Sequence, residues 1–467
     1  MKKTTCMEFV GAVKKKKVDI DEFYTELFSE LARLNKKYNF LITIAEKKPG
    51  KVAGSLSGLP VSAKDCICTK GVQSTAGSRI LEGYVPPFDA TCVSRVKGQG
   101  AEIVGKTSQD EFGFGTFSTN CGFAVPKNPI DPTRTCGGSS GGAAGLVRAL
   151  DMPHIALAES TGGSISCPAS FCGVVGLTPT YGLVSRYGLI DYANSLDKIG
   201  PIGRSVEDAA LMLSAIAGYD KLDSTSINRK PENYLDCIKS SSLRGVRIGL
   251  PREYFGEGVD KNVNRAVMDA VEKMKELGAK TEKCSLPNTK YSIPAYYIIA
   301  TAEASTNLAK YCGMRYGREE AIEGEFNEYF SRVRSRYFGT EAKRRILLGT
   351  YARMAGYRDQ YYLKAMKVRR LIINDFRKAF KRFDVLIAPT MPVVAPRFSE
   401  IAKLTPVENY MMDILTVAPN LAGIPMMSVP CGSVGGMPVG MHILGDHLQE
   451  ATVLRTGKAF ENVSRGR

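Results

Sequence analysis

Two glycine-framed serine clusters lie close together in the sequence and hold residue types that readily do chemistry. The first, from Cys136 to Leu146, reads CGGSSGGAAGL, and the second, from Glu159 to Ser166, reads ESTGGSIS. A serine hydroxyl becomes a nucleophile when a neighbouring base takes its proton. Glycine lets the backbone turn sharply, so that several N–H groups can point at one oxyanion. The clusters therefore fit a flexible loop, a phosphate-binding loop or two pieces of one catalytic site.

Two common motifs fit these clusters poorly. The GGSSGG segment lacks the Gly-Lys-Ser/Thr ending of a phosphate-binding loop. Residues 137–141 satisfy G-x-S-x-G, but a hydrolase built on that motif needs a histidine base downstream. Besides His154, the chain has only His442, in an apolar strand-like segment, and His447, in a polar turn, and both positions are typical of structural histidines. A mechanism with a base other than histidine is the remaining interpretation.

A third interpretation joins both clusters with a lysine. Ser164 would attack a carbonyl carbon, Ser139 would relay the proton, and Lys64 would receive it. Ser164 follows an expected strand at 154–159, and Lys64 lies in LPVSAKD at the end of another. The amides that could bind the oxyanion belong to Thr161, Gly162, Gly163 and Ser164 itself. A lysine is protonated in water at neutral pH, so burial must favour the neutral form of this base.

Four segments together resemble the amidase signature family: LPVSAKD, CGGSSGGAAG, TGGSIS and CPASFCGVVGLTPTYG. Their order and spacing agree with that family, and the similarity extends over nearly the whole chain. By this resemblance Lys64 is the catalytic lysine, Ser139 the bridging cis-serine and Ser164 the nucleophile that forms the acyl-enzyme. The resemblance implies an α/β protein with the amidase signature fold, a large mixed β-sheet flanked by helices.

The pattern of expected elements agrees with one large α/β domain over residues 1–467. It comprises N-terminal helices at 1–50, a serine and lysine core at about 55–220, and a helical cap with the remaining strands at about 245–467. Ser205 to Asp208 form a capping box that opens an apolar helix, and residues 21–38 carry one apolar face. The other expected elements are strands at 59–63, 101–106, 247–250, 384–388 and 439–444, a helix from Asp260 to Gly278, and mainly helices from 296 to 380.

The C-terminal half resembles one branch of the family, the glutamine-hydrolysing subunits of tRNA-dependent amidotransferases. The resemblance lies in KRRILLGTYARMAGYRDQYYLKAMKVRR, YMMDILTVAPNLAGIPMMSVPCG and GGMPVGMHILG. It implies that Asp413 holds the α-amino group of glutamine and Arg345 its α-carboxylate, with Tyr296 or its neighbour Tyr297 lining the pocket. A zwitterion calls for one anion and one cation in a fixed arrangement.

The same resemblance implies partners. An amidotransferase B subunit would use the ammonia, with ATP and Mg²⁺ bound there, to amidate mischarged Glu-tRNA(Gln), and no cofactor is expected in this chain. A small C subunit and a second substrate, Asp-tRNA(Asn), stay open. A stand-alone amidase and a catalytically silent scaffold subunit are the alternatives.

The sequence departs from the family at three positions. Position 143 is Ala where Ser is common, and the nucleophile loop usually reads Asp-Thr-Gly-Gly-Ser-Ile-Arg. This chain has Ser160 and Ser166 in place of the flanking Asp and Arg. Replacing both members of an ion pair can be nearly neutral, whereas removing one alone is costly. We therefore expect a compensated change, in which the two serine hydroxyls share a hydrogen bond.

Composition narrows the class of protein. The chain of 467 residues has 44% apolar and 24% charged residues, which is typical of a soluble globular protein. No apolar run reaches the length of a membrane span, and no signal peptide is evident, so we expect a cytoplasmic protein. The 12 cysteines form neither paired C-x-x-C knuckles nor a cluster with histidine, so no metal site is expected. The net charge of +16 is compatible with an acidic partner such as tRNA.

Overall fold

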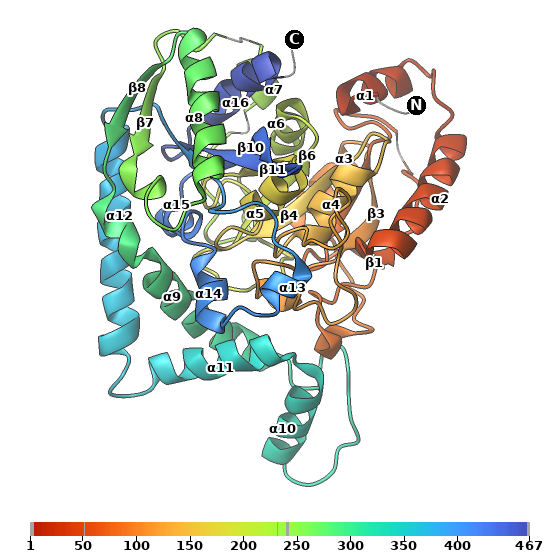
Figure 1. Ribbon diagram of the computed structural model, residues 1–467. Coiled ribbons are helices and arrows are strands. Elements are labelled where there is room, and N and C mark those ends of the chain that lie inside the picture. The colour runs from red at the N-terminus through yellow and green to blue at the C-terminus, as the bar shows by residue number, and fades with distance from the viewer. Residues whose placement is uncertain (1–3, 51, 231, 240–241, 465–467) are drawn as a thin grey trace.

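The computed structural model describes residues 4–50, 52–230, 232–239 and 242–464. These ranges form one mixed 11-stranded sheet with helices packed around it (Figure 1). The expected α/β fold with a large mixed sheet is confirmed. In the order of the sheet, the strands are β1 (Leu41–Ile44), β3 (Glu102–Thr107), β2 (Pro60–Lys64), β4 (Ile155–Ser160), β6 (Lys198–Gly203), β5 (Val175–Thr178), β10 (Met426–Val434), β11 (Met437–Gly445), β9 (Val385–Pro389), β7 (Arg247–Pro251) and β8 (Lys280–Cys284).

The helices of the described residues fall into three groups along the chain. The first group is α1 (Cys6–Lys14), α2 (Ile20–Tyr38), α3 (Thr91–Gly98), α4 (Gly141–Ala149), α5 (Ser166–Cys172) and α6 (Val206–Ile216). The second is α7 (Tyr234–Cys237), α8 (Lys261–Glu276), α9 (Ser292–Asn307), α10 (Phe326–Tyr337), α11 (Thr340–Arg353) and α12 (Lys364–Phe380). The third is α13 (Phe398–Ile401), α14 (Pro406–Met411), α15 (Val417–Ala422) and α16 (Glu450–Ser464).

Parallel strands in the first half of the chain position the two serine clusters. The strand β2 pairs in parallel with both β3 and β4, and every residue of β2 and β4 is buried. The central strands of a parallel sheet are covered on both faces, which explains their near-continuous apolar sequences. Because parallel strands end at the same edge of a sheet, the ends of β2 and β4 lie next to each other. This places Lys64 beside the loop that begins after Ser160.

The second half of the chain extends the same sheet and covers one end of it. The strand β10 pairs with β5, so the C-terminal strands continue the sheet of the first half. The helix α9 packs against both α11 and α12. In Figure 1, α11 lies at the bottom of the molecule and α10 projects below it, while α1 and α2 lie at the upper right. No helix of the described residues is long and apolar enough to cross a membrane.

The expected elements agree with the structure to within one or two residues where the apolar pattern was strong. The Ser205 capping box is present at the start of α6, and Asp260 caps α8. Five strands of the described residues were not expected: β1, β5, β6, β8 and β10. The strand β5 contains glycine, β6 contains glycine and proline, and β8 reads KTEKC, whose residues are half-buried or exposed at the edge of the sheet.

Candidate active site

Lys64 is the last residue of β2, and its side chain is fully buried. Its Nζ donates hydrogen bonds to Ser139 Oγ at 2.6 Å and to the backbone carbonyl of Glu159 at 3.0 Å. A third bond reaches Glu159 Oε2 at 2.8 Å. The predicted pair of Lys64 and Ser139 is therefore in direct contact at the end of two parallel strands.

Glu159 is a member of this site that sequence reasoning missed. It lies near the end of β4, and its side chain is 4% exposed. Its backbone carbonyl also accepts a hydrogen bond from Ser140 Oγ at 3.1 Å. A glutamate in the otherwise apolar segment IALAES was the available signal, because a buried carboxylate nearly always has a partner.

The two serine clusters lie side by side. The Gly138–Ser139 peptide bond is cis, and the next amide, of Ser140, donates to the Ser164 carbonyl at 3.2 Å. Ser164 is 6% exposed, and its hydroxyl makes no hydrogen bond to another described residue. The structure thus brings the nucleophile candidate next to Ser139 through the backbone, without a hydrogen bond between the two hydroxyls.

The loop from Thr161 to Ser164 joins β4 to α5, and its glycines are required by close neighbours. A Cβ at Gly162 would lie 2.9 Å from the hydroxyl of Tyr296, and one at Gly163 would overlap Thr416. The Tyr296 hydroxyl is 2.8 Å from Thr161 Oγ1. The glycine loop is therefore held between the sheet and α9, and Tyr296 touches it directly.

Asp413 lies behind this loop in a buried position. Its carboxylate accepts hydrogen bonds from Thr116 Oγ1 at 3.0 Å and from the Tyr297 hydroxyl at 2.8 Å. Burial raises the pKa of Asp413 to about 6. The structure brings Tyr297, the neighbour of Tyr296, into contact with Asp413, whereas Tyr296 faces the glycine loop.

Arg345 lies on α11 and is 3% exposed. Its Nε donates to Glu341 Oε1 at 2.8 Å and its Nη1 to the Tyr192 hydroxyl at 2.6 Å. Four aromatic rings surround the guanidinium at 5.0 to 5.6 Å, those of Phe114, Tyr192, Tyr297 and Tyr410. Such rings stabilise a buried cation through their π faces.

A cavity of about 230 Å³ opens beside these residues. Thr116, Arg345 and Tyr410 line it, and Thr116 also bonds Asp413. Gly113 is not a lining residue of the cavity but lies close to the lysine and serine pair. A Cβ on Gly113 would lie 3.6 Å from Ser139 Oγ, from Glu159 Oε2 and from the Tyr192 ring.

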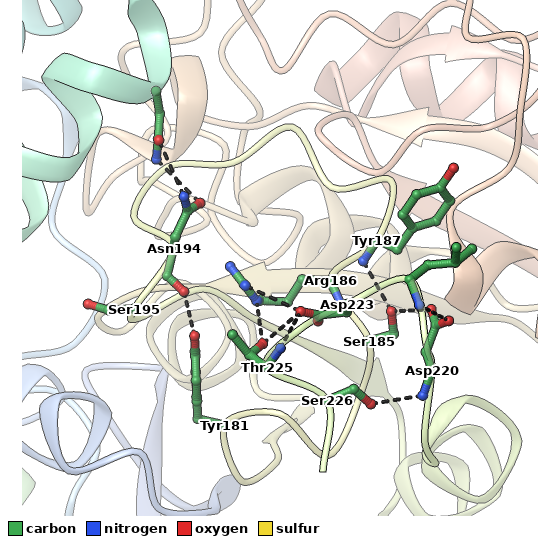
Figure 2. A network of polar contacts seen from close by, with 12 residues as sticks. Tyr181, Ser185, Arg186, Tyr187, Asn194, Ser195, Asp220, Asp223, Thr225 and Ser226 are labelled. Carbon is green, nitrogen blue, oxygen red and sulfur yellow. Dashed lines mark hydrogen bonds and ion pairs between the residues drawn. The ribbon is translucent and has the colours of Figure 1, made fainter. Parts of the chain in front are cut away.

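A polar network fixes the loop that carries Tyr192. Figure 2 shows the segment 181–195 tied to residues 220–226. Arg186 donates its backbone N–H to Asp223 Oδ2 at 2.8 Å, and the Tyr181 hydroxyl donates to the Asn194 carbonyl at 2.6 Å. Tyr192, whose hydroxyl accepts a hydrogen bond from Arg345, lies within this tethered segment.

The sequence matches the model of a known family. The family model described as "Amidase" matches residues 20–454. The chain belongs to the amidase family. The expected resemblance is confirmed, and the chain is an enzyme of this family by its sequence.

Named relatives place the chain more closely within the amidase family. It is 52% identical over 412 residues to the A subunit of glutamyl-tRNA(Gln) amidotransferase of Methanococcoides burtonii, with 88% of this chain and 86% of the relative covered. The crystal structure of the corresponding A subunit from Thermotoga maritima is 37% identical, with a TM-score of 0.84 and coverage of 98% and 94%. The native peptide amidase of Stenotrophomonas maltophilia is 28% identical, with a TM-score of 0.82 and coverage of 99% and 97%.

The two serines that replace charged residues of this amidase family lie in different surroundings. Ser166 Oγ is 3.2 Å from His442 Nε2, whereas Ser160 Oγ has no hydrogen-bond partner among the described residues. The expected hydrogen bond between the two serines is therefore wrong. Burial lowers the pKa of His442 to about 3, so the imidazole is neutral and serves as a structural partner.

Lys198 is a basic residue that lies opposite Ser160 and near His442, the partner of Ser166. It is directly opposite Ser160 in the antiparallel pair of β4 and β6, so the two side chains share a face of the sheet. Its Nζ donates to the Ile424 carbonyl at 3.1 Å, and burial lowers its pKa to about 7. Within the described ranges no group of three or more His, Cys, Asp or Glu side chains is arranged to hold a metal ion.

Proposed function

We propose that this chain is the glutamine-hydrolysing subunit of a tRNA-dependent amidotransferase. In this proposal Ser164 attacks the side-chain amide carbon of glutamine, ammonia leaves, and water then hydrolyses the glutamyl ester. Ser139 and Lys64 carry the proton away from the nucleophile. The amides of residues 161–164 stabilise the oxyanion that forms on the amide oxygen.

The observation that carries the proposal is the pair of opposite charges at one aromatic wall. The Tyr297 hydroxyl bonds Asp413, and its ring lies 5.3 Å from the Arg345 guanidinium. A free α-amino acid carries one cationic and one anionic group on the same carbon. Asp413 would hold the amino group and Arg345 the carboxylate, and both are buried where such contacts are strong. The side-chain amide would then extend toward Ser164.

The relatives support the identity of the larger assembly. Each of them is named as the A subunit of an amidotransferase, and such a name implies that the enzyme has other subunits. In the proposal the ammonia passes to a B subunit, which binds ATP and Mg²⁺ and amidates Glu-tRNA(Gln) in the cytoplasm. A small C subunit completes the complex in the three-subunit form.

The test is glutamate release from glutamine by the chain alone and by the chain co-expressed with its B subunit. The proposal predicts turnover of glutamine that rises in the complex, together with amidation of Glu-tRNA(Gln). A stand-alone amidase is the second candidate, because the peptide amidase has the same fold at a TM-score of 0.82. Hydrolysis of simple amides by the chain alone, without preference for glutamine, would favour that candidate.

A further inference from the structure

Each N–H group of the Lys64 ammonium has a hydrogen-bond acceptor. A protonated lysine carries three N–H donors and no lone pair. Three oxygens lie within hydrogen-bond distance of Nζ: Ser139 Oγ at 2.6 Å, the Glu159 carbonyl at 3.0 Å and Glu159 Oε2 at 2.8 Å. In that state Ser139 receives a hydrogen bond from Lys64 and cannot give its own proton to it. One proton must leave Nζ before the lysine can act as a base.

The nearest acceptor for that proton is the carboxylate of Glu159. Of the three oxygens, Oε2 alone belongs to a carboxylate, and it lies in a fully buried contact, with the two side chains 0% and 4% exposed. The other oxygen of this carboxylate, Oε1, has no hydrogen-bond partner among the described residues. A carboxylate that accepts several hydrogen bonds is stabilised as an anion. In Glu159 only Oε2 has a donor, Lys64 Nζ, so a proton that leaves Nζ along this hydrogen bond arrives at the carboxylate.

Asp110 shows the contrast with a well-supported buried carboxylate. Its two oxygens accept backbone hydrogen bonds from Ser118 at 2.8 Å and from Asn120 at 2.9 Å. Burial nevertheless raises the pKa of Asp110 to about 6. Glu159 is equally enclosed and, among the described residues, has Lys64 as the single donor to its side chain.

A second buried carboxylate and a buried thiol lie near Glu159. Burial raises the pKa of Asp197, and the negative charge of Glu159 raises it further. The Cys66 thiol lies near both Lys64 and Glu159, and burial raises its pKa well above the usual range. Two carboxylates in a buried region repel each other, and that repulsion ends when either of them is neutral.

We propose that Glu159 accepts a proton from Lys64, so that Lys64 can take the proton of Ser139 and, through it, that of the nucleophile. Glu159 acts through Lys64 and is a positioning residue of the amidase reaction. The proposal rests on the proposed function only for the roles of Lys64, Ser139 and Ser164, and it holds for any amide substrate.

The step balances without a proton from solvent. The Ser164 O–H bond breaks as its oxygen bonds the amide carbon, and the amide π electron pair moves to the carbonyl oxygen. The proton passes to Ser139, the Ser139 proton passes to Lys64, and one Lys64 proton forms an O–H bond on Glu159. When the carbon–nitrogen bond breaks, the same path runs in reverse and delivers the proton to the leaving nitrogen. Ammonia departs, and Glu159 is again a carboxylate.

The test compares Glu159→Gln with the unchanged protein, in complex with its partner subunit, over a range of pH. The glutamine side chain keeps the size and the hydrogen bond but cannot accept the proton. Under the proposal, kcat falls by at least about tenfold with KM unchanged, in the range of general acid–base effects. The acid limb of the pH–rate profile moves to higher pH, because Lys64 must now lose its proton to solvent before each turnover.

A counter-ion role predicts the opposite shift. If Glu159 only stabilises the ammonium form of Lys64, it makes the neutral, basic form of the lysine less populated. Removal of the carboxylate would then move the acid limb to lower pH. That shift, or a profile and kcat that do not change, would overturn the proposal. Glu450→Gln is the matched control, because this carboxylate is also buried and bonds the Thr180 amide at 2.7 Å. It should leave the profile in place.

A second measurement covers the case in which the Glu159→Gln variant does not fold. A boronic acid that adds to the nucleophile displaces the Ser164 proton in the unchanged enzyme. Under the proposal an infrared difference spectrum then shows the carbonyl stretch of a protonated carboxyl, and its absence contradicts the relay. The kinetic comparison is repeated with a simple amide as substrate, and the infrared measurement needs no substrate. If glutamine is not hydrolysed and the simple amide is, the proposed function fails while the relay is still tested.

Discussion

The catalytic centre and the amino-acid pocket are built in different ways. Lys64 and Glu159 come from the ends of neighbouring parallel strands, and their side chains bond each other directly. Asp413 and Arg345 come from the connection before α15 and from α11, and aromatic rings separate and orient them. The first region is part of the sheet, whereas the second lies outside it and consists of α9, α11 and the connection before α15, together called the helical cap below.

The difference assigns separate tasks to the two regions. Strand ends in a buried sheet hold reacting groups with little freedom, as proton transfer requires. A helical cap can change its side chains without disturbing the sheet, which suits substrate selection. The peptide amidase shares this fold, so the sheet alone does not choose the substrate. Changes in the sheet region should therefore lower kcat, and changes in the cap should raise KM.

The largest effect is expected for Ser164→Ala. Loss of the nucleophile removes the acyl-enzyme route, so glutamine hydrolysis should disappear while the protein stays folded. Amidation of Glu-tRNA(Gln) with free ammonia by the complex should continue, because the partner's chemistry is unchanged. Glutamate release and ammonia-dependent amidation are measured on the same preparation. If the Ser164→Ala protein still hydrolyses glutamine, the nucleophile does not belong to the sheet region.

The next effect is expected for Asp413→Ala. A hydrogen bond to a charged group contributes about 1.5–3 kcal/mol, so the KM for glutamine should rise by about ten- to a hundredfold. Hydrolysis of a simple amide without an α-amino group should change far less. Steady-state kinetics with both substrates separate these outcomes. Equal losses for the two substrates would show that Asp413 does not bind the amino group.

A smaller effect is expected from pH. Burial raises the pKa of Asp413 to about 6, so its carboxylate is ionised above that pH and neutral below it. The α-amino group of glutamine stays positive in this range, and its contact is lost as the pH falls. The KM for glutamine should therefore rise by about tenfold between pH 7 and pH 5. Asp413→Asn should abolish this dependence, and a KM that is constant in the wild type would contradict it.

The smallest effects are expected at Ser160 and Ser166. Ser160→Asp places a carboxylate opposite Lys198, whereas Ser166→Arg adds a guanidinium beside His442 in the same buried region as Lys198. We expect Ser166→Arg alone to lower the melting temperature most, and the double variant to recover part of the loss. A double-mutant cycle should give a coupling of about 0.5–3 kcal/mol. Simple additivity of the two effects would show that the positions do not interact.

Short-range patterns in the sequence predicted the sheet region well. The strands that end at Lys64 and before Ser164 were expected, because apolar runs followed by polar loops are a local signal. The partner of Lys64 was not expected, since nothing local shows that Glu159 points at residue 64. A contact across 95 positions depends on which strands become neighbours.

The cap was harder to predict for the same reason. Asp413 and Arg345 were identified by resemblance, but the choice between Tyr296 and Tyr297 depends on the rotation of α9. The structure shows that the two rings face different partners, one at the glycine loop and one at Asp413. The expected hydrogen bond between Ser160 and Ser166 does not form, because Ser166 Oγ is paired with His442 instead. His442 comes from a strand that is distant in the sequence, so no local pattern indicated this pair.

The role of Ser164 as the nucleophile is tested most directly by trapping the acyl-enzyme during turnover of glutamine. Rapid quenching and peptide mass spectrometry locate any covalent glutamyl group on the chain. We predict an ester on the peptide that contains Ser164, at the residue itself, and no ester in the Ser164→Ala protein. A glutamyl group on Ser139 or on Cys167, three residues after Ser164 in the sequence, or glutamate release with no adduct at all, would contradict this assignment.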